Sequence, residues 1–344
     1  MRSSREQRQN GAIFDYIGEN EMGKYREYGF VNTKEMFQKA YDGKYAIPAF
    51  NFVCLEQMLA IVEACMETRS PFILQSSSNV RKYIGPIMVQ RMAQACIETM
   101  QHEEKQVPMA LHLDHGMTYD DCKSCIDSGF SSVMIDGSAL PYEKNMELTT
   151  RVVEYAHRYD VTVEGELGVL SGVEEDLIHT ESRFTDPALV EDFVKRTGID
   201  SLAISIGTCH GVVKVKVRKG EPVPPLRFDI LGEVERRIPG FSIVLHGASA
   251  ILPKYVDMIN RYGGRLDDAQ GIPEEQVVQA AKTSVCKINI ASDGWIATTA
   301  IVRKVLEENP SVIDPRRYLS KARDEMKQLY MRKTVEVFGS AGKA

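Results

Sequence analysis

Eight short apolar segments, spaced along most of the chain, constrain the fold more than any other feature of the sequence. Each is almost continuously apolar in its middle and ends in small or polar residues, which is typical of strands that are covered on both faces. The predicted strands are Ala46–Phe52, Pro71–Ser77, Pro108–His115, Ser131–Gly137, Thr162–Gly168, Ser201–Gly207, Ser242–Ala248 and Val285–Ala291.

Segments with apolar residues at helical spacing lie between these strands. The predicted helices are Leu55–Thr68, Glu143–His157, Pro187–Arg196, Ile230–Arg237 and Pro273–Lys282. Asp186 precedes Pro187, which is the order of a helix cap and a first-turn proline. Strict alternation of strands and helices predicts an α/β fold with a parallel sheet, and eight strands is the number that closes a (β/α)8 TIM barrel. An open, doubly wound sheet is the alternative, because periodicity does not show whether the sheet closes.

The two ends of the chain and one insertion lie outside this alternation. Residues 1–33 are predicted as an N-terminal extension with a short helix, and residues 214–225 (KVKVRKGEPVPP) as a basic, Pro-rich loop. Residues 315–344 are predicted as a helical tail that packs on the barrel or on a partner subunit. Because TIM barrels often exceed 250 residues as one unit, we expect a single domain over residues 1–344.

Composition excludes several classes of function. The net charge is −6, with 43% apolar and 26% charged residues, and the basic residues are scattered, so we expect no nucleic-acid partner. We also expect no membrane partner, because no apolar run reaches the roughly 18 residues of a membrane span and no signal peptide opens the chain. Seven cysteines at irregular spacing indicate reduced thiols and a cytoplasmic protein.

Three of the seven histidines lie at the C-terminal ends of predicted strands. They are His115 in LHLDHG, His210 in IGTCHG and His246 in LHGAS, and each precedes a glycine, which allows close approach of the backbone to a ligand. Active sites of TIM barrels form at this end of the strands. A single histidine there often serves a structural hydrogen bond. Three together match a catalytic zinc site, which keeps a fourth position open for water or substrate.

Acidic residues lie next to these histidines. Asp114 directly precedes His115 and is a candidate general acid or base, or alternatively a group that orients an imidazole. Glu166 faces the rim of the barrel and is a candidate metal contact. Glu174 and Glu175 belong to the acidic run SGVEED, which is either a mobile lid that delivers an acid or base or a solvated loop.

Small and polar residues after the last three strands suggest a phosphate site. In TIM barrels the loops after strands seven and eight commonly bind phosphate through backbone N–H groups and a helix N-terminus. The candidates after the sixth, seventh and eighth strands are Gly211, Lys214, Gly247, Ser249 and Ser292.

In their order along nearly the whole chain, these motifs resemble the class II fructose-bisphosphate aldolase family. The motifs are LHLDHG, MIDGS, VEGELG, IGTCHG, LRFDIL, LHGAS and KINIASD. The resemblance implies a zinc ion bound by His115, His210 and His246, with Glu166 as an alternative metal contact. It also implies that Asp114 exchanges a proton with the hydroxyl group on carbon 4 of a ketose phosphate.

The resemblance implies further contacts with the substrate. Gly211, Lys214, Gly247, Ser249 and Ser292 match positions that hold the phosphate on carbon 1. Asn289 matches an asparagine near the ketose hydroxyls, and Asn51 and Ser77 match rim positions near the substrate. Glu174 or Glu175 matches a mobile-loop glutamate that handles the proton on the three-carbon half. Family members often bind a monovalent cation (Na⁺ or K⁺) beside the phosphate, and most are homodimers or homotetramers.

Three residues depart from the family pattern. Ala291 stands where the family usually has an acidic or amide residue, and Ala248 stands where a second glycine is usual. Trp295 stands where the nearest subgroup commonly has an arginine that resembles one reaching the distal phosphate in a neighbouring subunit. Arginine and tryptophan differ in charge and in hydrogen-bonding capacity, so this difference affects the far end of the substrate.

The chemistry implied is reversible aldol cleavage to dihydroxyacetone phosphate and an aldehyde. Fructose 1,6-bisphosphate is the default substrate, and tagatose 1,6-bisphosphate or a ketose 1-phosphate with another tail, such as sulfofructose 1-phosphate, is the alternative. Zinc would act as a Lewis acid, so the reaction needs no Schiff-base lysine. Lys287 is the only candidate for such a lysine within the predicted strands, and it is interpreted as structural. The competing functions are a zinc hydrolase, with Asp114 activating water, and a non-catalytic binding protein.

Overall fold

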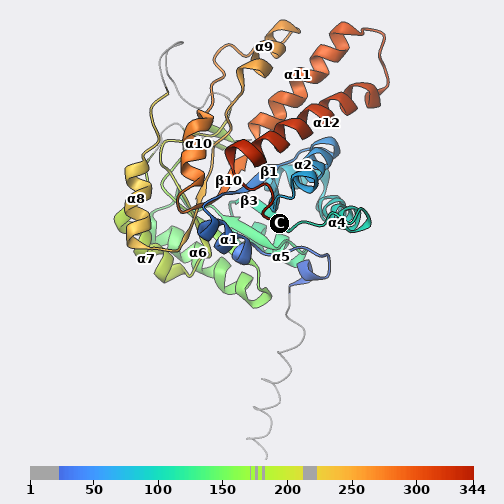
Figure 1. Ribbon diagram of the computed structural model, residues 1–344. Helices are drawn as coiled ribbons and strands as arrows, with labels where there is room; N and C mark the ends of the chain where they lie inside the picture. Colours follow the sequence, from blue (N-terminus) through green and yellow to red (C-terminus); the bar gives the residue numbers. More distant parts are fainter. Residues whose placement is uncertain (1–22, 171, 175–176, 180–182, 212–222) are drawn as a thin grey trace, which may run out of the picture.

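A closed barrel of eight parallel strands forms the centre of the molecule (Figure 1). The computed structural model describes residues 23–344, except residues 171, 175–176, 180–182 and 212–222. The barrel strands are β1 Ile47–Asn51, β2 Phe72–Ser77, β3 Met109–Gly116, β4 Ser132–Ile135, β5 Thr162–Leu167, β8 Ser201–Ile204, β9 Ser242–Leu245 and β10 Val285–Ile290. All eight predicted strands are confirmed. Pairing of β1 with β10 closes the barrel and rules out the open sheet.

Helices α2 to α10 lie between successive barrel strands, whereas α1 precedes the first strand and α11 and α12 follow the last. They are α1 Thr33–Gly43, α2 Leu55–Thr68, α3 Ser78–Ile84, α4 Pro86–His102, α5 Tyr119–Asp127, α6 Tyr142–Ala156, α7 Pro187–Thr197, α8 Phe228–Arg237, α9 Pro253–Arg261, α10 Glu274–Ala281, α11 Ser292–Glu308 and α12 Pro315–Arg332. The five predicted helices are confirmed within two residues at each end. Asp186 caps α7 as predicted, because its side chain accepts a hydrogen bond of 2.9 Å from the amide of Ala188.

Shorter elements complete the described chain. Two 3₁₀ helices span Lys24–Arg26 and His157–Tyr159, and a π-helix spans Lys333–Val337. After β5 the chain forms an antiparallel pair, β6 Gly172–Glu174 and β7 Leu177–His179. Residues 1–22, most of the predicted N-terminal extension, lie outside the described residues, as do residues 212–222, which hold most of the predicted basic loop.

The barrel interior changes from apolar to polar along its axis. At the N-terminal end of the strands, Met36 and Phe37 of α1 pack against Ile47, Ala49 and neighbouring apolar side chains, so this helix closes the bottom of the barrel. A small layer of Met134, Ala203 and Val244 lies within the barrel. Polar side chains occupy the inward positions toward the C-terminal end of the strands, while alternate strand residues pack outward against the helices.

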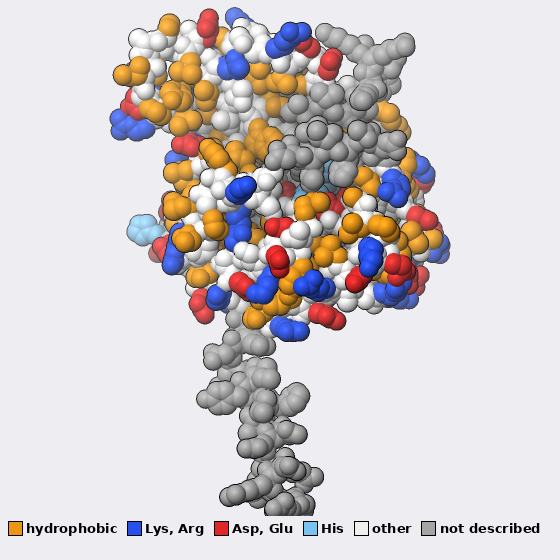
Figure 2. Space-filling view, turned by 180° about the vertical axis from the view of Figure 1, so that it is seen from behind, with side chains coloured by type: hydrophobic (Ala, Val, Ile, Leu, Met, Phe, Trp, Pro, Cys, Tyr) orange, Lys and Arg blue, Asp and Glu red, His pale blue; other side chains and the backbone are white. Residues whose placement is uncertain are grey.

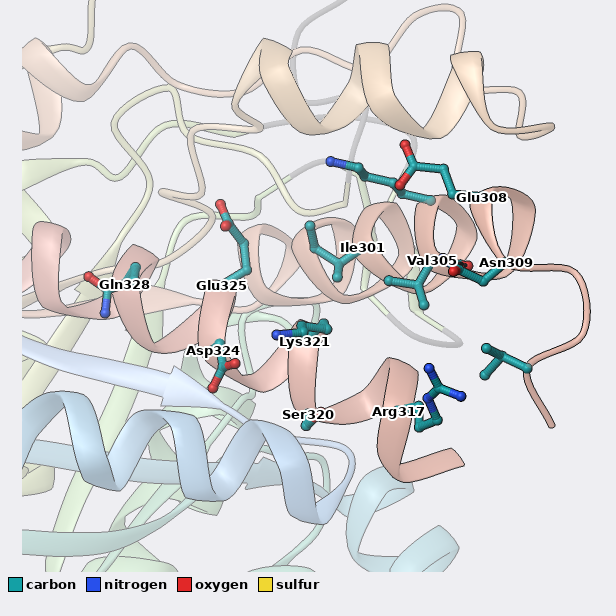
Figure 3. A pocket seen from close by; sticks show the side chains of 12 residues that line it. Ile301, Val305, Glu308, Asn309, Arg317, Ser320, Lys321, Asp324, Glu325 and Gln328 are labelled. Carbon is teal, nitrogen blue, oxygen red and sulfur yellow. Dashed lines mark hydrogen bonds between the residues drawn. The ribbon is translucent and has the colours of Figure 1, made fainter. Parts of the chain in front are cut away.

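The C-terminal part of the chain forms a helical hairpin. α11 and α12 lie side by side and extend beyond the barrel (Figure 1), and Figure 3 shows the apolar and charged side chains that line the groove along them. α12 also packs on the barrel, where the ring of Tyr330 lies 4.5 Å from that of Phe50. Within the predicted tail, residues 315–344, the helix α12 therefore contacts this chain's own core. Among the described residues, no helix has the length and apolar character that a membrane span requires.

Candidate metal centre and active site

The three histidines predicted from their strand-end positions come together at one point. His115 lies in β3, His246 follows β9, and His210 lies in the loop after β8; all three are buried, and each offers a ring nitrogen within 4.8 Å of the others. The ring centroid of His115 is 4.7 Å from that of His246 and 5.2 Å from that of His210. Figure 2 shows histidine and acidic side chains in a hollow on the face seen from behind.

Asp136 orients His115. Its Oδ2 lies 3.0 Å from Nδ1 of His115, so the other ring nitrogen, Nε2, faces the remaining histidines. Burial opposes ionisation of Asp136, but the contact with His115 outweighs it and lowers the pKa of this carboxyl. Sequence reasoning did not single out Asp136 as a site residue. Its position at the tip of β4, in the MIDGS motif, was the available signal.

The backbone at His115 and the glycines beside the histidines serve close packing. His115 itself has a φ of +50°, an uncommon value for a non-glycine residue that is often found at functional sites. A Cβ on Gly116 would lie 2.7 Å from the carbonyl oxygen of Met134, and one on Gly247 would lie 2.5 Å from that of Cys209. A side chain at either position would therefore meet the protein's own backbone, so close packing alone requires glycine at both.

Glu166 lies beside the histidines, as predicted. Its Oε2 is 3.9 Å from Nδ1 of His115, and His115, Asp136 and Glu166 together form a second group of converging ligand atoms. Both groups share His115. The arrangement therefore offers nitrogen ligands on one side of that ring and carboxylate ligands on the other.

Asp114 sits in a cage of amide side chains. Its Oδ2 accepts hydrogen bonds from Asn51 at 2.7 Å and from Gln75 at 3.2 Å, and its Oδ1 accepts one from Asn289 at 3.0 Å. Oδ1 also lies 4.0 Å from Nε2 of His115. The structure therefore brings Asp114, Asn51 and Asn289 together as predicted, and it adds Gln75, which sequence reasoning missed.

Asn289 also has an unused hydrogen-bonding atom. Its Nδ2 reaches Asp114 and lies 3.2 Å from Nδ1 of His246, whereas its buried Oδ1 has no hydrogen-bond partner in the described part of the chain. Buried polar atoms are nearly always paired. The free Oδ1 next to the histidines is thus consistent with a polar ligand in this site.

Three loops meet where the phosphate site was predicted. The Ser249 hydroxyl accepts a hydrogen bond of 3.3 Å from the amide of Ala291, and the Ser292 hydroxyl lies 3.5 Å from the carbonyl oxygen of Gly211. Ser292 is also the first residue of α11, so the N-terminus of a long helix points into this region. The structure thereby brings Gly211, Ser249 and Ser292 together, while Lys214 lies outside the described residues.

The structure gives less information on the remaining predicted site residues, Ser77, Glu174 and Glu175. Ser77 pairs in register with Asp114, and its hydroxyl caps α3 by accepting a hydrogen bond of 3.2 Å from the amide of Val80. It therefore has a structural role in addition to its predicted rim position. Glu174 ends β6, but its side chain lies outside the described structure, and so does the whole of Glu175.

Nearly the whole chain matches a known protein family. The family description "Fructose-bisphosphate aldolase class-II" matches residues 31–343. The chain belongs to the class II fructose-bisphosphate aldolase family. The resemblance inferred from the motifs is therefore confirmed, and this aldolase is a carbon–carbon lyase.

Individual relatives agree with this assignment. This aldolase is 57% identical over 332 residues to the fructose-bisphosphate aldolase of Treponema pallidum, which covers 94% of this chain and 100% of the relative. It is 40% identical over 311 residues to that of Giardia intestinalis, covering 90% of this chain and 93% of the relative. Among solved structures, the YdjI aldolase from Escherichia coli K12 is 26% identical, with a TM-score of 0.69, and the match covers 92% of this chain and 99% of that one.

Class II aldolases depend on a metal ion, and the residues present here fit one. Three buried imidazoles provide nitrogen ligands, and nearby carboxylates are held in place by hydrogen bonds of their own. Burial lowers the pKa of His246, which favours the neutral imidazole that binds a metal. The histidine group is therefore the candidate metal centre of this aldolase.

Proposed function

We propose that this aldolase holds Zn²⁺ on His115, His210 and His246 and reversibly cleaves fructose 1,6-bisphosphate to dihydroxyacetone phosphate and an aldehyde. The observation that carries the proposal is the position of Asp114, whose Oδ1 lies 4.0 Å from His115 while three amide side chains hold its carboxylate. Three imidazoles suit zinc. Glu166 is the alternative metal contact. The names of the relatives support the choice of substrate.

In this proposal, two different residues of the chain carry out the two proton transfers. The bound ion supplies Lewis acidity to the ketose carbonyl. Asp114 takes the proton of the hydroxyl on carbon 4 as the bond between carbons 3 and 4 breaks, so that carbon 4 becomes the aldehyde. The electron pair of that bond stays with the three-carbon half. We place Glu174 or Glu175 as the acid that protonates this half, which completes dihydroxyacetone phosphate.

The phosphate on carbon 1 is proposed to bind where the loops after β8, β9 and β10 meet. Its contacts in this proposal are Gly211, Lys214, Gly247, Ser249 and Ser292, with a Na⁺ or K⁺ ion beside it. The N-terminus of α11 supports this position, because unpaired amides there favour an anion. Asn51, Ser77 and Asn289 are proposed to contact the sugar.

The oligomeric state and the cellular location of this aldolase are part of the same proposal. We propose that the chain forms one catalytic domain that assembles into a homodimer or homotetramer and works in the cytoplasm. All seven cysteines are free thiols, in keeping with a reducing compartment. Sedimentation analysis of the purified protein would give the number of subunits.

The identity of the group at the distal end of the substrate is the most detailed part of the proposal. Ala291 is half-buried at the N-cap of α11 and offers no charge, and Nε1 of Trp295 has no hydrogen-bond partner among the residues that the structure describes. The test is kcat/KM of the zinc-loaded enzyme for ketose 1-phosphates that differ only beyond carbon 4. We expect the highest value for fructose 1,6-bisphosphate. A higher value for tagatose 1,6-bisphosphate or sulfofructose 1-phosphate would overturn the substrate but not the chemistry.

A further inference from the structure

A buried ion pair lies inside the barrel next to the histidine group. Glu164 of β5 and Lys287 of β10 are both buried, and Nζ of Lys287 lies 2.7 Å from Oε2 of Glu164. The other carboxylate oxygen, Oε1, lies 2.7 Å from Nε2 of His246. The Lys287 ammonium is therefore the counter-charge of this buried carboxylate. The proposed chemistry uses neither Glu164 nor Lys287.

A second histidine fixes the direction of these hydrogen bonds. Lys287 also lies 3.0 Å from Nε2 of His112, and an ammonium group can only donate. His112 therefore accepts at Nε2 and carries its proton on Nδ1, which lies 2.8 Å from the hydroxyl of Ser132. A ring that accepts at Nε2 and is protonated only at Nδ1 is neutral. Lys287 thus has two partners and serves as a buried structural cation, as its sequence context indicated.

The same reasoning shows which ring nitrogen carries the proton in His115 and in His246, two of the proposed metal ligands. An ionised carboxylate only accepts, so Glu164 requires a proton on Nε2 of His246, and Asp136 requires one on Nδ1 of His115. When both rings are neutral, the atoms left without a proton are Nδ1 of His246 and Nε2 of His115. These two atoms lie 2.9 Å apart. Two lone pairs that face each other at this distance fit a shared cation.

We infer that Glu164, held in place by Lys287, is a positioning residue that fixes the tautomer of His246 and so makes Nδ1 its metal-binding atom. The inference rests on the proposed metal site. It gives the ion pair a role beyond filling the barrel, since a carboxylate behind a ligating histidine sets the orientation and basicity of the ring.

The test compares two double variants that both remove the ion pair, so that neither leaves a buried charge without a partner. Glu164→Met/Lys287→Met removes the acceptor for His246, whereas Glu164→Gln/Lys287→Met keeps a carbonyl oxygen at that position. Zinc affinity is measured by competition with a chelator. We expect the Met/Met variant to bind zinc about 10–100-fold more weakly than the wild type, and the Gln/Met variant to recover most of that loss. Equal zinc affinities for the two variants would overturn the inference.

A control separates this effect from a general loss of stability. Glu274 is a carboxylate paired with Arg332 and Lys333 rather than with the histidines. Glu274→Gln is expected to lower stability and leave zinc affinity unchanged. If it weakens zinc binding as much as the Met/Met variant does, the loss reflects stability and the inference is wrong.

A measurement on the wild-type protein tests the role of Glu164 even if the double variants do not fold. Long-range ¹H–¹⁵N NMR of the metal-free wild type is expected to show His246 protonated at Nε2, and protonation at Nδ1 alone would overturn the inference. Failure of the proposed metal site gives a different result. In that case the wild type binds no zinc, while the tautomer of His246 still reports on Glu164.

Discussion

At the scale of single residues, Asp114 is the group on which the proposed chemistry depends most. Three amide donors hold its carboxylate in one orientation beside the metal site, so its loss should affect the proton transfer rather than the metal. We expect Asp114→Ala to keep its zinc and to lose about 10²–10⁴-fold in kcat, the usual contribution of a general acid or base. Zinc content per chain and steady-state turnover are the measurements. Loss of zinc in this variant would instead mark Asp114 as a structural support of His115.

The sequence located the proposed metal ligands and base better than the residues that support them. His115, His210, His246 and Asp114 were predictable because the C-terminal ends of parallel strands meet at one rim of a barrel. Asp136, Gln75 and Glu164 were not predicted as site residues. Each occupies an inward-facing position whose partner lies on another strand. Those partners depend on the register between strands, which periodicity along one strand does not contain.

At the scale of elements, a buried lysine joins the end of α12 to the proposed phosphate site. Nζ of Lys333 lies 2.8 Å from the buried carboxylate of Asp293, whose oxygens accept hydrogen bonds from the amides of Ala250 and Ile251. We expect Lys333→Met to lower the free energy of unfolding by about 3–5 kcal/mol, because it leaves Asp293 buried without a counter-charge. Urea denaturation is the measurement.

The matched control for that variant is a lysine on the surface. Lys39 pairs with Glu35 on α1 and is exposed. An exposed pair contributes about 0–1 kcal/mol, so Lys39→Met should change stability by no more than that. Similar losses in the two variants would show that the buried pair has no special role.

The pKa of Glu274 predicts how the stability of the protein changes at low pH. Burial raises the pKa of Glu274, but Arg332 and Lys333 outweigh it and lower the pKa to about 2. The unfolded chain therefore binds a proton at higher pH than the folded chain does. The contribution of Glu274 to stability is complete above its unfolded pKa, near 4.3, and is lost as the pH falls toward 2. The difference in unfolding free energy between wild type and Glu274→Gln should shrink over this range. A difference that stays constant or grows would contradict the assignment.

Helices and strands were predictable to within a few residues, but some of their roles were not. The apolar periodicity of α2 and the cap of α7 fixed those helices from local sequence alone. The role of α1 in closing the bottom of the barrel is different, because it depends on Met36 and Phe37 meeting side chains of several strands. The buried residues of α1 do recur at helical spacing, but that spacing does not show which strands they meet.

At the scale of the whole molecule, barrel closure is what produces the site. Closure brings the ends of β3, β5, β8, β9 and β10 around one axis. The proposed base and one proposed metal ligand on β3, the proposed ligands after β8 and β9, and the buried ion pair of β5 and β10 therefore converge. The count of eight strands was readable from the sequence. The pairing of β1 with β10 that completes the ring is a long-range contact, and only the structure shows it.

The central claim is that zinc on the three histidines drives aldol cleavage. The most direct measurement is turnover of fructose 1,6-bisphosphate by chelator-stripped enzyme as zinc is added back, with His210→Ala as the parallel variant. The account predicts no turnover without metal, full recovery with zinc bound to the wild type, and no recovery in His210→Ala. Undiminished cleavage by the stripped wild type, or full recovery in the variant, would contradict it.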